Sequence, residues 1–131
     1  MDPSVERLIR DGYAAFARGD SDGLRRVFHP DAEYVNPPYA IESGIRRGVD
    51  ELSGIWRGLH ELFEIDSVQV DELREGPGGV FVMTRTRGRG RGSGIPNDVT
   101  QAHVLEVRDG RIARLAWFAT REEGLAAAGL S

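Results

Sequence analysis

The spacing of hydrophobic residues changes near residue 65, and this change restricts the fold more than any other feature of the sequence. Before it, apolar residues recur every three or four positions, which predicts amphipathic helices. After it, apolar and polar residues alternate, which predicts strands with one buried face. The expected helices cover residues 3–19, 20–29 and 49–63, and the expected strands cover residues 65–75, 80–91, 96–107 and 111–119. Helices first and an antiparallel meander afterwards indicate an α+β fold, in which three N-terminal helices pack on a curved antiparallel sheet.

Smaller segments complete the predicted fold. Residues 31–36 alternate and are followed by two prolines, which favours a short or edge strand. The next residues, up to 48, are expected to form a loop. Asp109 and Gly110 make a favoured two-residue hairpin turn. Residues 120–123 form a capping box that opens a short C-terminal helix.

The composition is that of an ordinary soluble globule. The 131 residues, 40% hydrophobic and 29% charged, suffice for a single domain over residues 1–131 with its own core. The net charge of -4 argues against a dedicated nucleic-acid-binding protein, and the absence of cysteine excludes disulfides and thiol chemistry. The first residues carry scattered charges rather than an apolar signal segment, and no apolar run reaches membrane-spanning length. We therefore expect a cytoplasmic protein that binds neither nucleic acid nor membrane.

The stretch TRTRGRGRGSG, residues 84–94, can be interpreted as a disordered arginine–glycine tail or as one strand that enters a turn. Strand alternation places Arg85 and Arg87 on the same face as Phe81 and Met83, and it places the glycines on the other face. A disordered tail has no reason to keep this register, which favours the strand. A half-buried arginine needs an acid or an anionic ligand, so two roles stay open for Arg85 and Arg87: they face a pocket, or they pair with acids.

Helices packed on a long curved meander enclose a pocket, and the segments that predict this layout also resemble a known family. They are YAAFARGDSDGLRRVFHPDAEYVNPP, RRGVDELSGIW, RGRGRGSG and VTQAHVLEVRDGRIARLAWFATREEGLAAAGL. With them the chain resembles a SnoaL-like domain of the nuclear-transport-factor-like superfamily, the cone-shaped fold shared with ketosteroid isomerases and limonene epoxide hydrolase. For an enzyme, the resemblance implies cofactor-free isomerase, cyclase or hydratase chemistry on a small hydrophobic or polyketide-like substrate. It equally leaves open a module that binds a ligand or dimerises without chemistry.

The resemblance to ketosteroid isomerases carries over in part. Tyr13 matches the tyrosine that donates a hydrogen bond to the enolate oxygen, and His103 falls near the protonated aspartate of the same site. Asn36 stands in place of the general-base aspartate, and its amide accepts no proton at neutral pH. His103 is then the best candidate for moving a proton, because an unperturbed histidine has a pKa of about 6.5.

The resemblance to limonene epoxide hydrolase is partial as well. Tyr34 and Asn36 match the pair that positions the attacking water, and Arg85 matches the arginine of that site. The two aspartates of the site fall on Arg87 and near Ala116, so its acid and its base are both missing. Epoxide hydrolysis is therefore not expected.

Together these arguments define one set of candidate site residues. The candidates for catalysis are His103, Tyr13, Tyr34, Asn36 and Arg85. The candidates for contact with the substrate are Phe16, Trp56, Phe81, Met83, Arg87, Gln101 and Phe118. No metal site is expected, because the histidines lie far apart without ligand spacing, and no cofactor is expected.

The outer face of the sheet gives a prediction about assembly. Alternation puts Trp117 on the face opposite Ala116 and Phe118, and we expect Trp117, Leu115 and Val104 to form an apolar outer face. Such a face needs a cover, and a homodimer through the outer sheet face would provide it.

Overall fold

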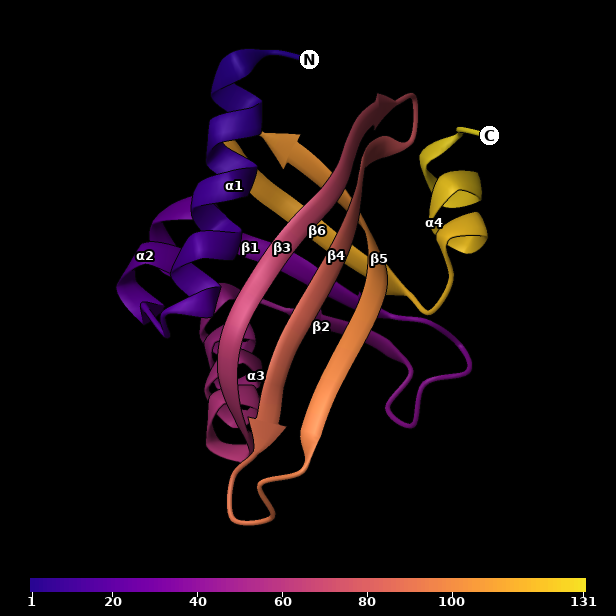
Figure 1. The fold of residues 1–131 in the computed structure, drawn as a ribbon. Coiled ribbons are helices and arrows are strands. Elements are labelled where there is room, and N and C mark those ends of the chain that lie inside the picture. Colours follow the sequence, from indigo (N-terminus) through magenta and orange to yellow (C-terminus); the bar gives the residue numbers. More distant parts are fainter.

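The computed structural model describes residues 1–131 and consists of four helices and one six-stranded sheet (Figure 1). The helices are α1 (Pro3–Ala17), α2 (Ser21–Val27), α3 (Val49–Leu62) and α4 (Arg121–Ala128). The strands are β1 (Phe28–Asn36), β2 (Gly44–Arg47), β3 (Phe63–Gly76), β4 (Gly79–Gly90), β5 (Pro96–Arg108) and β6 (Arg111–Phe118). The predicted α+β cone, with three N-terminal helices, a curved and mostly antiparallel sheet and a short C-terminal helix, is confirmed. None of the four helices has both the length and the apolar character that a membrane crossing requires.

Three of the helices begin at side chains that cap them. The carboxylate of Asp2 accepts from the backbone N–H of Ser4 at 2.8 Å at the start of α1. Asp20 caps α2 in the same way, and the hydroxyl of Thr120 accepts from the backbone N–H of Glu123 at 3.2 Å at the start of α4. These contacts satisfy backbone donors that have no partner within the helix.

The sheet has the strand order β2-β1-β6-β5-β4-β3. β1 lies between two neighbours, antiparallel to β2 and parallel to β6, so the prediction of a short or edge strand is wrong. The prolines that suggested an edge follow the strand, and Pro30 lies where the pairing with β6 shifts register between Phe28 and Glu33. A proline at such an irregularity removes no regular ladder hydrogen bond. The expected loop before residue 48 is also corrected, because it contains β2.

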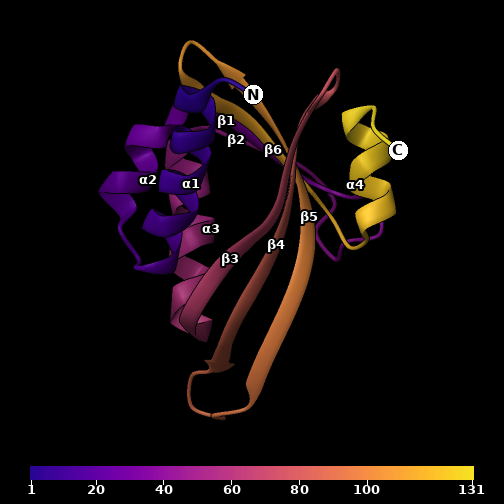
Figure 2. The same cartoon turned by 45° about the horizontal axis from the view of Figure 1, so that its top comes forward.

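The two faces of the sheet have different covers. The helices α1, α2 and α3 lie against one face, here called the inner face, and α4 lies against the other, the outer face (Figure 2). The largest fully buried side chains of the inner core are Ile9, Leu52, Val82 and Leu105. The buried residues of the outer core are Phe81, Ala102 and Val104 on the sheet and Leu125 and Ala128 on α4.

The position of α4 corrects the expected facing of several side chains. Phe81, Met83 and Phe118 were expected to line the pocket, but they pack with α4 on the outer face. The chain turns back after β6 and lays α4 over these residues, which the alternation within single strands does not reveal. Gly124 permits this close approach, since a Cβ at that position would lie 2.6 Å from the Cβ of Ala102.

The expected apolar outer face is corrected for the same reason. Leu115 and Trp117 belong to the inner core instead of the outer face. Val104 does lie on the outer face, but it is buried beneath α4. The homodimer stays a prediction, without the exposed apolar face that motivated it.

The stretch 84–94 forms the end of β4 and the turn that follows it, as predicted from its register. Arg85 donates two hydrogen bonds to Asp98, of 2.8 and 2.6 Å, and Arg87 lies 3.6 Å from the same carboxylate. The hydrogen bond from Arg85 lowers the pKa of the Asp98 carboxyl. Of the two roles left open for Arg85 and Arg87, the structure therefore shows pairing with an acid on the outer face.

Candidate functional site

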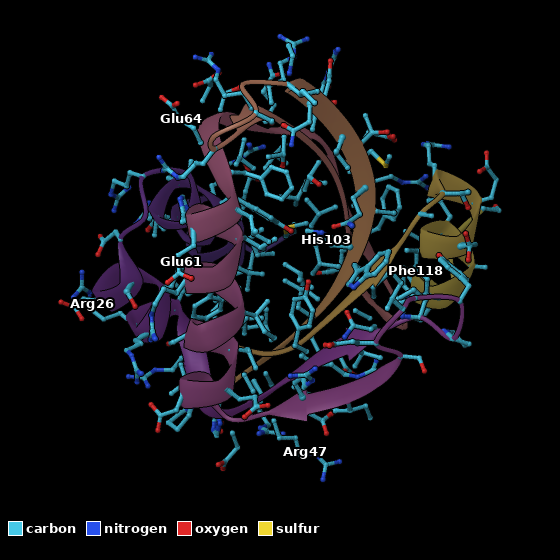
Figure 3. The ribbon with its side chains drawn as sticks, turned by 90° about the horizontal axis from the view of Figure 1, so that it is seen from below. Arg26, Arg47, Glu61, Glu64, His103 and Phe118 are labelled. Atoms are coloured by element: carbon cyan, nitrogen blue, oxygen red, sulfur yellow. The ribbon has the colours of Figure 1, made fainter.

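A cavity of about 760 Å³ lies between the helices and the inner face of the sheet. Figure 3 shows His103 inside the ring that α3 and the sheet form, whereas Phe118 lies on the side of α4. Of the 30 residues that line the cavity, 21 are hydrophobic. A concave, mainly apolar space of this size with a few polar groups is typical of a site for a small organic molecule.

The structure brings seven of the predicted site residues together and leaves five outside. Those that line the cavity are Tyr13, Phe16, Tyr34, Asn36, Trp56, Gln101 and His103. Those that do not are Phe81, Met83, Arg85, Arg87 and Phe118. The five share the strand parity that points to the outer face, so no arginine of β4 can act on a ligand in the cavity.

A chain of hydrogen bonds crosses the interior of the cavity. The hydroxyl of Tyr13, on α1, lies 2.6 Å from Nδ1 of His103, in the middle of β5. Nε2 of His103 lies 2.7 Å from Oε1 of Gln101, two residues earlier on the same strand. Because successive strand residues point to opposite faces, Gln101 and His103 share the inner face. Both nitrogens of the imidazole are therefore engaged by side chains of the cavity.

Burial shifts the pKa values of the three titratable side chains in the cavity interior, His103, Tyr34 and Tyr13. It lowers the pKa of His103 to about 4 and raises the pKa of Tyr34 to about 12. The pKa of Tyr13 is raised well above its usual range, mainly by burial and further by the neighbouring Tyr34 phenol. At neutral pH the two phenols and the imidazole are thus uncharged, and the interior offers hydrogen bonds rather than charge.

Tyr34 and Asn36 differ in what they leave available to a ligand. The hydroxyl of Tyr34 has no hydrogen-bond partner within the chain, although its ring packs against the inner core. The amide oxygen of Asn36 accepts from Nε1 of Trp117 at 2.5 Å. Since this oxygen already accepts one hydrogen bond, Asn36 is poorly placed to position an attacking water by accepting another from it. The hydrolase-like role of the Tyr34–Asn36 pair gains no support from this geometry.

The mouth of the cavity contains residues that sequence reasoning missed. The loop after β1 places Tyr39 and Ile41 at the lining, and the hydroxyl of Tyr39 accepts from the backbone N–H of Ala119 at 2.8 Å. Glu42 and Arg46 also line the cavity and form an ion pair with each other. The sequence of this loop has no periodic pattern. Its two large hydrophobic residues, Tyr39 and Ile41, are the only signal from which contact with the cavity could have been predicted.

The charged groups of the lining are confined to this mouth. Glu42 and Arg46 are the only Asp, Glu, Lys or Arg residues among the lining residues, and Arg46 also lies 3.4 Å from Glu51. No group of three or more His, Asp or Glu side chains gathers anywhere in a way that could hold a metal ion. The interior therefore holds neither a carboxylate base nor a cation.

The fold and the cavity define the class of the protein, a ketosteroid-isomerase-like α+β cone with an internal pocket. The model of the SnoaL-like domain family matches residues 9–115. The chain therefore belongs to the SnoaL-like domain family, which confirms the resemblance inferred from the sequence. It is also similar to uncharacterised proteins of Mycobacterium tuberculosis and Mycobacterium bovis, 32% identical over 113 residues, which is 85% of this chain and 85% of each of those proteins.

Solved structures share the fold at low sequence identity. A putative isomerase from Bacillus subtilis matches with a TM-score of 0.79 and 18% identity, over 98% of this chain and 94% of that chain. A putative SnoaL-like polyketide cyclase from Jannaschia sp. CCS1 matches with a TM-score of 0.75 and 19% identity, over 98% and 92%. A protein of Catenulispora acidiphila with a ketosteroid isomerase-like fold, in complex with trimethylamine, matches with a TM-score of 0.73 and 21% identity, over 95% and 93%. At these identities the likeness concerns the fold alone.

Proposed function

We propose that this protein binds a small, uncharged and mainly hydrophobic molecule in its cavity, with one oxygen of that molecule held at Tyr13 and Tyr34. The observation that carries the proposal is the set of uncharged polar side chains Tyr13, His103, Gln101 and Tyr34 that line a mainly apolar cavity of about 760 Å³. Apolar walls supply affinity by removing hydrophobic surface from water, and the cluster supplies orientation.

The absence of interior charge sets the selectivity of such a site. A ligand carboxylate in the cavity would lose its hydration and meet no cation, because Arg46 at the mouth is already paired with Glu42 and Glu51. An ammonium ligand, such as the trimethylamine bound by the Catenulispora protein, would meet aromatic faces but no interior carboxylate. An uncharged ligand avoids both penalties.

Calorimetric titration with a matched pair of bicyclic probes tests the proposal. At pH 7 we expect 2-naphthol, which is neutral, to bind at least ten-fold more tightly than 2-naphthoate, which has the same skeleton and a negative charge. Tyr34→Phe should weaken the binding of 2-naphthol, because it removes the one phenol without a partner in the chain. Equal or tighter binding of 2-naphthoate, or no binding of either probe, would overturn the proposal.

The contact between Tyr13 and His103 favours a second function, cofactor-free isomerisation or cyclisation of the bound molecule. In this reaction the Tyr13 oxygen takes a proton from the carbon next to a carbonyl, while the Tyr13 hydroxyl proton passes to Nδ1 of His103 over 2.6 Å. The electron pair of the broken C–H bond moves into the enolate, whose oxygen accepts a hydrogen bond from Tyr34. The lowered pKa of His103 opposes this transfer, so binding is the function that the site supports best.

Deuterium exchange separates the second function from binding alone. The protein should accelerate the exchange of the α-protons of 2-tetralone in D₂O, and Tyr13→Phe should remove the acceleration. Exchange at the rate of the buffer, in a protein that binds 2-naphthol, would leave a binding protein without this chemistry.

A further inference from the structure

Gln101 and Tyr13 form the two ends of the hydrogen-bond chain through His103. The hydrogen bond at Gln101 therefore decides whether the Tyr13 hydroxyl donates or accepts at the other end. We propose that Gln101 fixes the tautomer of His103, so that Tyr13 presents only an acceptor to the cavity and the site selects a ligand group that both donates and accepts, a hydroxyl or an enol. The choice of ligand rests on the proposed function, whereas the tautomer does not. Gln101 is in this account a positioning residue, because it acts on the ligand through His103 and Tyr13.

The direction of the chain follows from its donors and acceptors. Oε1 of Gln101 only accepts, so its partner at 2.7 Å, Nε2 of His103, carries the proton. A neutral imidazole has one N–H, which leaves a lone pair on Nδ1. The partner of that lone pair at 2.6 Å is the Tyr13 hydroxyl, which must donate to it. Tyr13 has no second proton, and its oxygen can therefore only accept from a ligand.

The backbone of Gln101 is itself held in place. Its carbonyl oxygen accepts from the hydroxyl of Thr84 at 3.0 Å, and Thr84 is its direct partner across β4 and β5. Thr84 is 2% exposed, so this contact is shielded from water. The side-chain amide nitrogen of Gln101 has no hydrogen-bond partner in the protein. The side-chain oxygen of Gln101, Oε1, is the atom that contacts Nε2 of His103.

The two phenols then offer opposite halves of a hydrogen bond. Tyr13 accepts, and Tyr34, whose hydroxyl has no partner in the chain, is free to donate. Both phenols line the same cavity, and both rings pack against the same inner core. A ketone or an ether would accept from Tyr34 and leave the Tyr13 oxygen without a donor. A hydroxyl or an enol satisfies both phenols, and a polar atom left unpaired in an apolar site is costly.

Nitrogen-15 NMR of the imidazole in the free protein tests the tautomer. We expect the Nε2–H form of His103 in the wild type, and the same form in Gln101→Glu, which keeps an acceptor. Gln101→Met removes the acceptor and should give a mixture of tautomers, with unchanged backbone signals in α4 as the control for folding. A wild-type His103 protonated on Nδ1 would overturn the proposal, and this measurement does not depend on the Met variant being stable.

A second pair of probes tests the ligand half of the proposal. In the wild type we expect 2-naphthol to bind at least ten-fold more tightly than 2-methoxynaphthalene, which accepts but cannot donate. The methyl ether is the more hydrophobic of the two, so apolar burial alone predicts the opposite order. In Tyr13→Phe the difference should disappear. Equal binding in the wild type would overturn the selection of a donor, whereas no binding of either probe would instead count against the proposed function and leave the tautomer result standing.

Discussion

The ring of Tyr13 stacks on the ring of His103, with 5.7 Å between their centroids and 19° between their planes, and the Tyr13 hydroxyl lies 2.6 Å from Nδ1 of His103. The two residues are 90 positions apart in the chain. This contact joins the first helix to the middle of β5 across the cavity. It places one polar pair among apolar side chains, and the behaviour of that pair can be measured directly.

His103 should stay neutral well below the pH at which an ordinary histidine gains its proton. Burial lowers its pKa to about 4, because the ring faces the cavity and not the bulk solvent. A titration of its ring signals by NMR should show a midpoint near that value. A midpoint at the value of about 6.5 expected for an exposed histidine would instead show that the cavity is filled with water.

The same shift links stability to pH. Between about pH 6.5 and pH 4 the unfolded chain binds a proton at His103 and the folded protein does not. The free energy of unfolding should therefore fall as the pH falls through this window, by up to about 3 kcal/mol from this group. Denaturant unfolding of the wild type and of His103→Gln over this range isolates the contribution, since the other titrating groups are common to both proteins. Parallel pH profiles would contradict it.

Removing either phenol should affect stability differently. Tyr13→Phe leaves Nδ1 of His103 without its partner, which should lower the free energy of unfolding by about 1–3 kcal/mol. Tyr34→Phe breaks no hydrogen bond within the chain and should change it by less than about 0.5 kcal/mol. Chemical denaturation of both variants tests the contrast. Equal losses would mean that the Tyr34 hydroxyl has a partner in the protein.

The fold could be predicted from the sequence because its signals are local. The periods of α1 and β4, the caps at Asp2 and Thr120, and the turn at Asp109-Gly110 each lie within a few neighbouring residues. The short β2 has no such signal, and the sequence predicts a loop at its position. Its pairing with β1 depends on a register that only the folded sheet sets.

The site could be predicted only in part, because alternation gives the parity of a strand but not which face is covered. Tyr13, Tyr34 and His103 were proposed from the resemblance and do line one cavity. Phe81 and Phe118 are among the candidates for contact with the substrate, but they face α4 on the outer side of the sheet. The pairing of Gln101 with His103 could have been suspected from their spacing of two on one strand, whereas the contact with Tyr13 depends on tertiary structure.

The close packing of α4 makes a pair of glycine variants informative. In Gly124→Ala the new Cβ would lie 2.6 Å from Ala102 and 2.9 Å from the Phe81 ring, so α4 must shift, at a cost of about 1–3 kcal/mol. Gly54→Ala in α3 meets no atom within 4 Å and should stabilise the protein by about 0.5–1 kcal/mol. Thermal unfolding of both variants checks the opposite signs. A stable Gly124→Ala protein would contradict the packing of α4 on the outer face.

Arg85 should be irrelevant to ligand binding. It pairs with Asp98 on the outer face, where both side chains are exposed by more than a third, and such an exposed pair contributes little to stability. Arg85→Met should therefore bind 2-naphthol as tightly as the wild type in calorimetric titration. A loss of affinity of ten-fold or more would place Arg85 in the site after all.

The central claim is that an uncharged ligand lies in the cavity with its oxygen between the two phenols, and a crystal structure with 6-bromo-2-naphthol tests it most directly. Anomalous scattering from the bromine locates the ring independently of the protein model. The account predicts a single bromine position among the apolar lining residues, with the ligand oxygen within hydrogen-bond distance of both Tyr13 and Tyr34. A ligand bound on the outer face, or one in the cavity whose oxygen points to the mouth at Glu42 and Arg46, would contradict it.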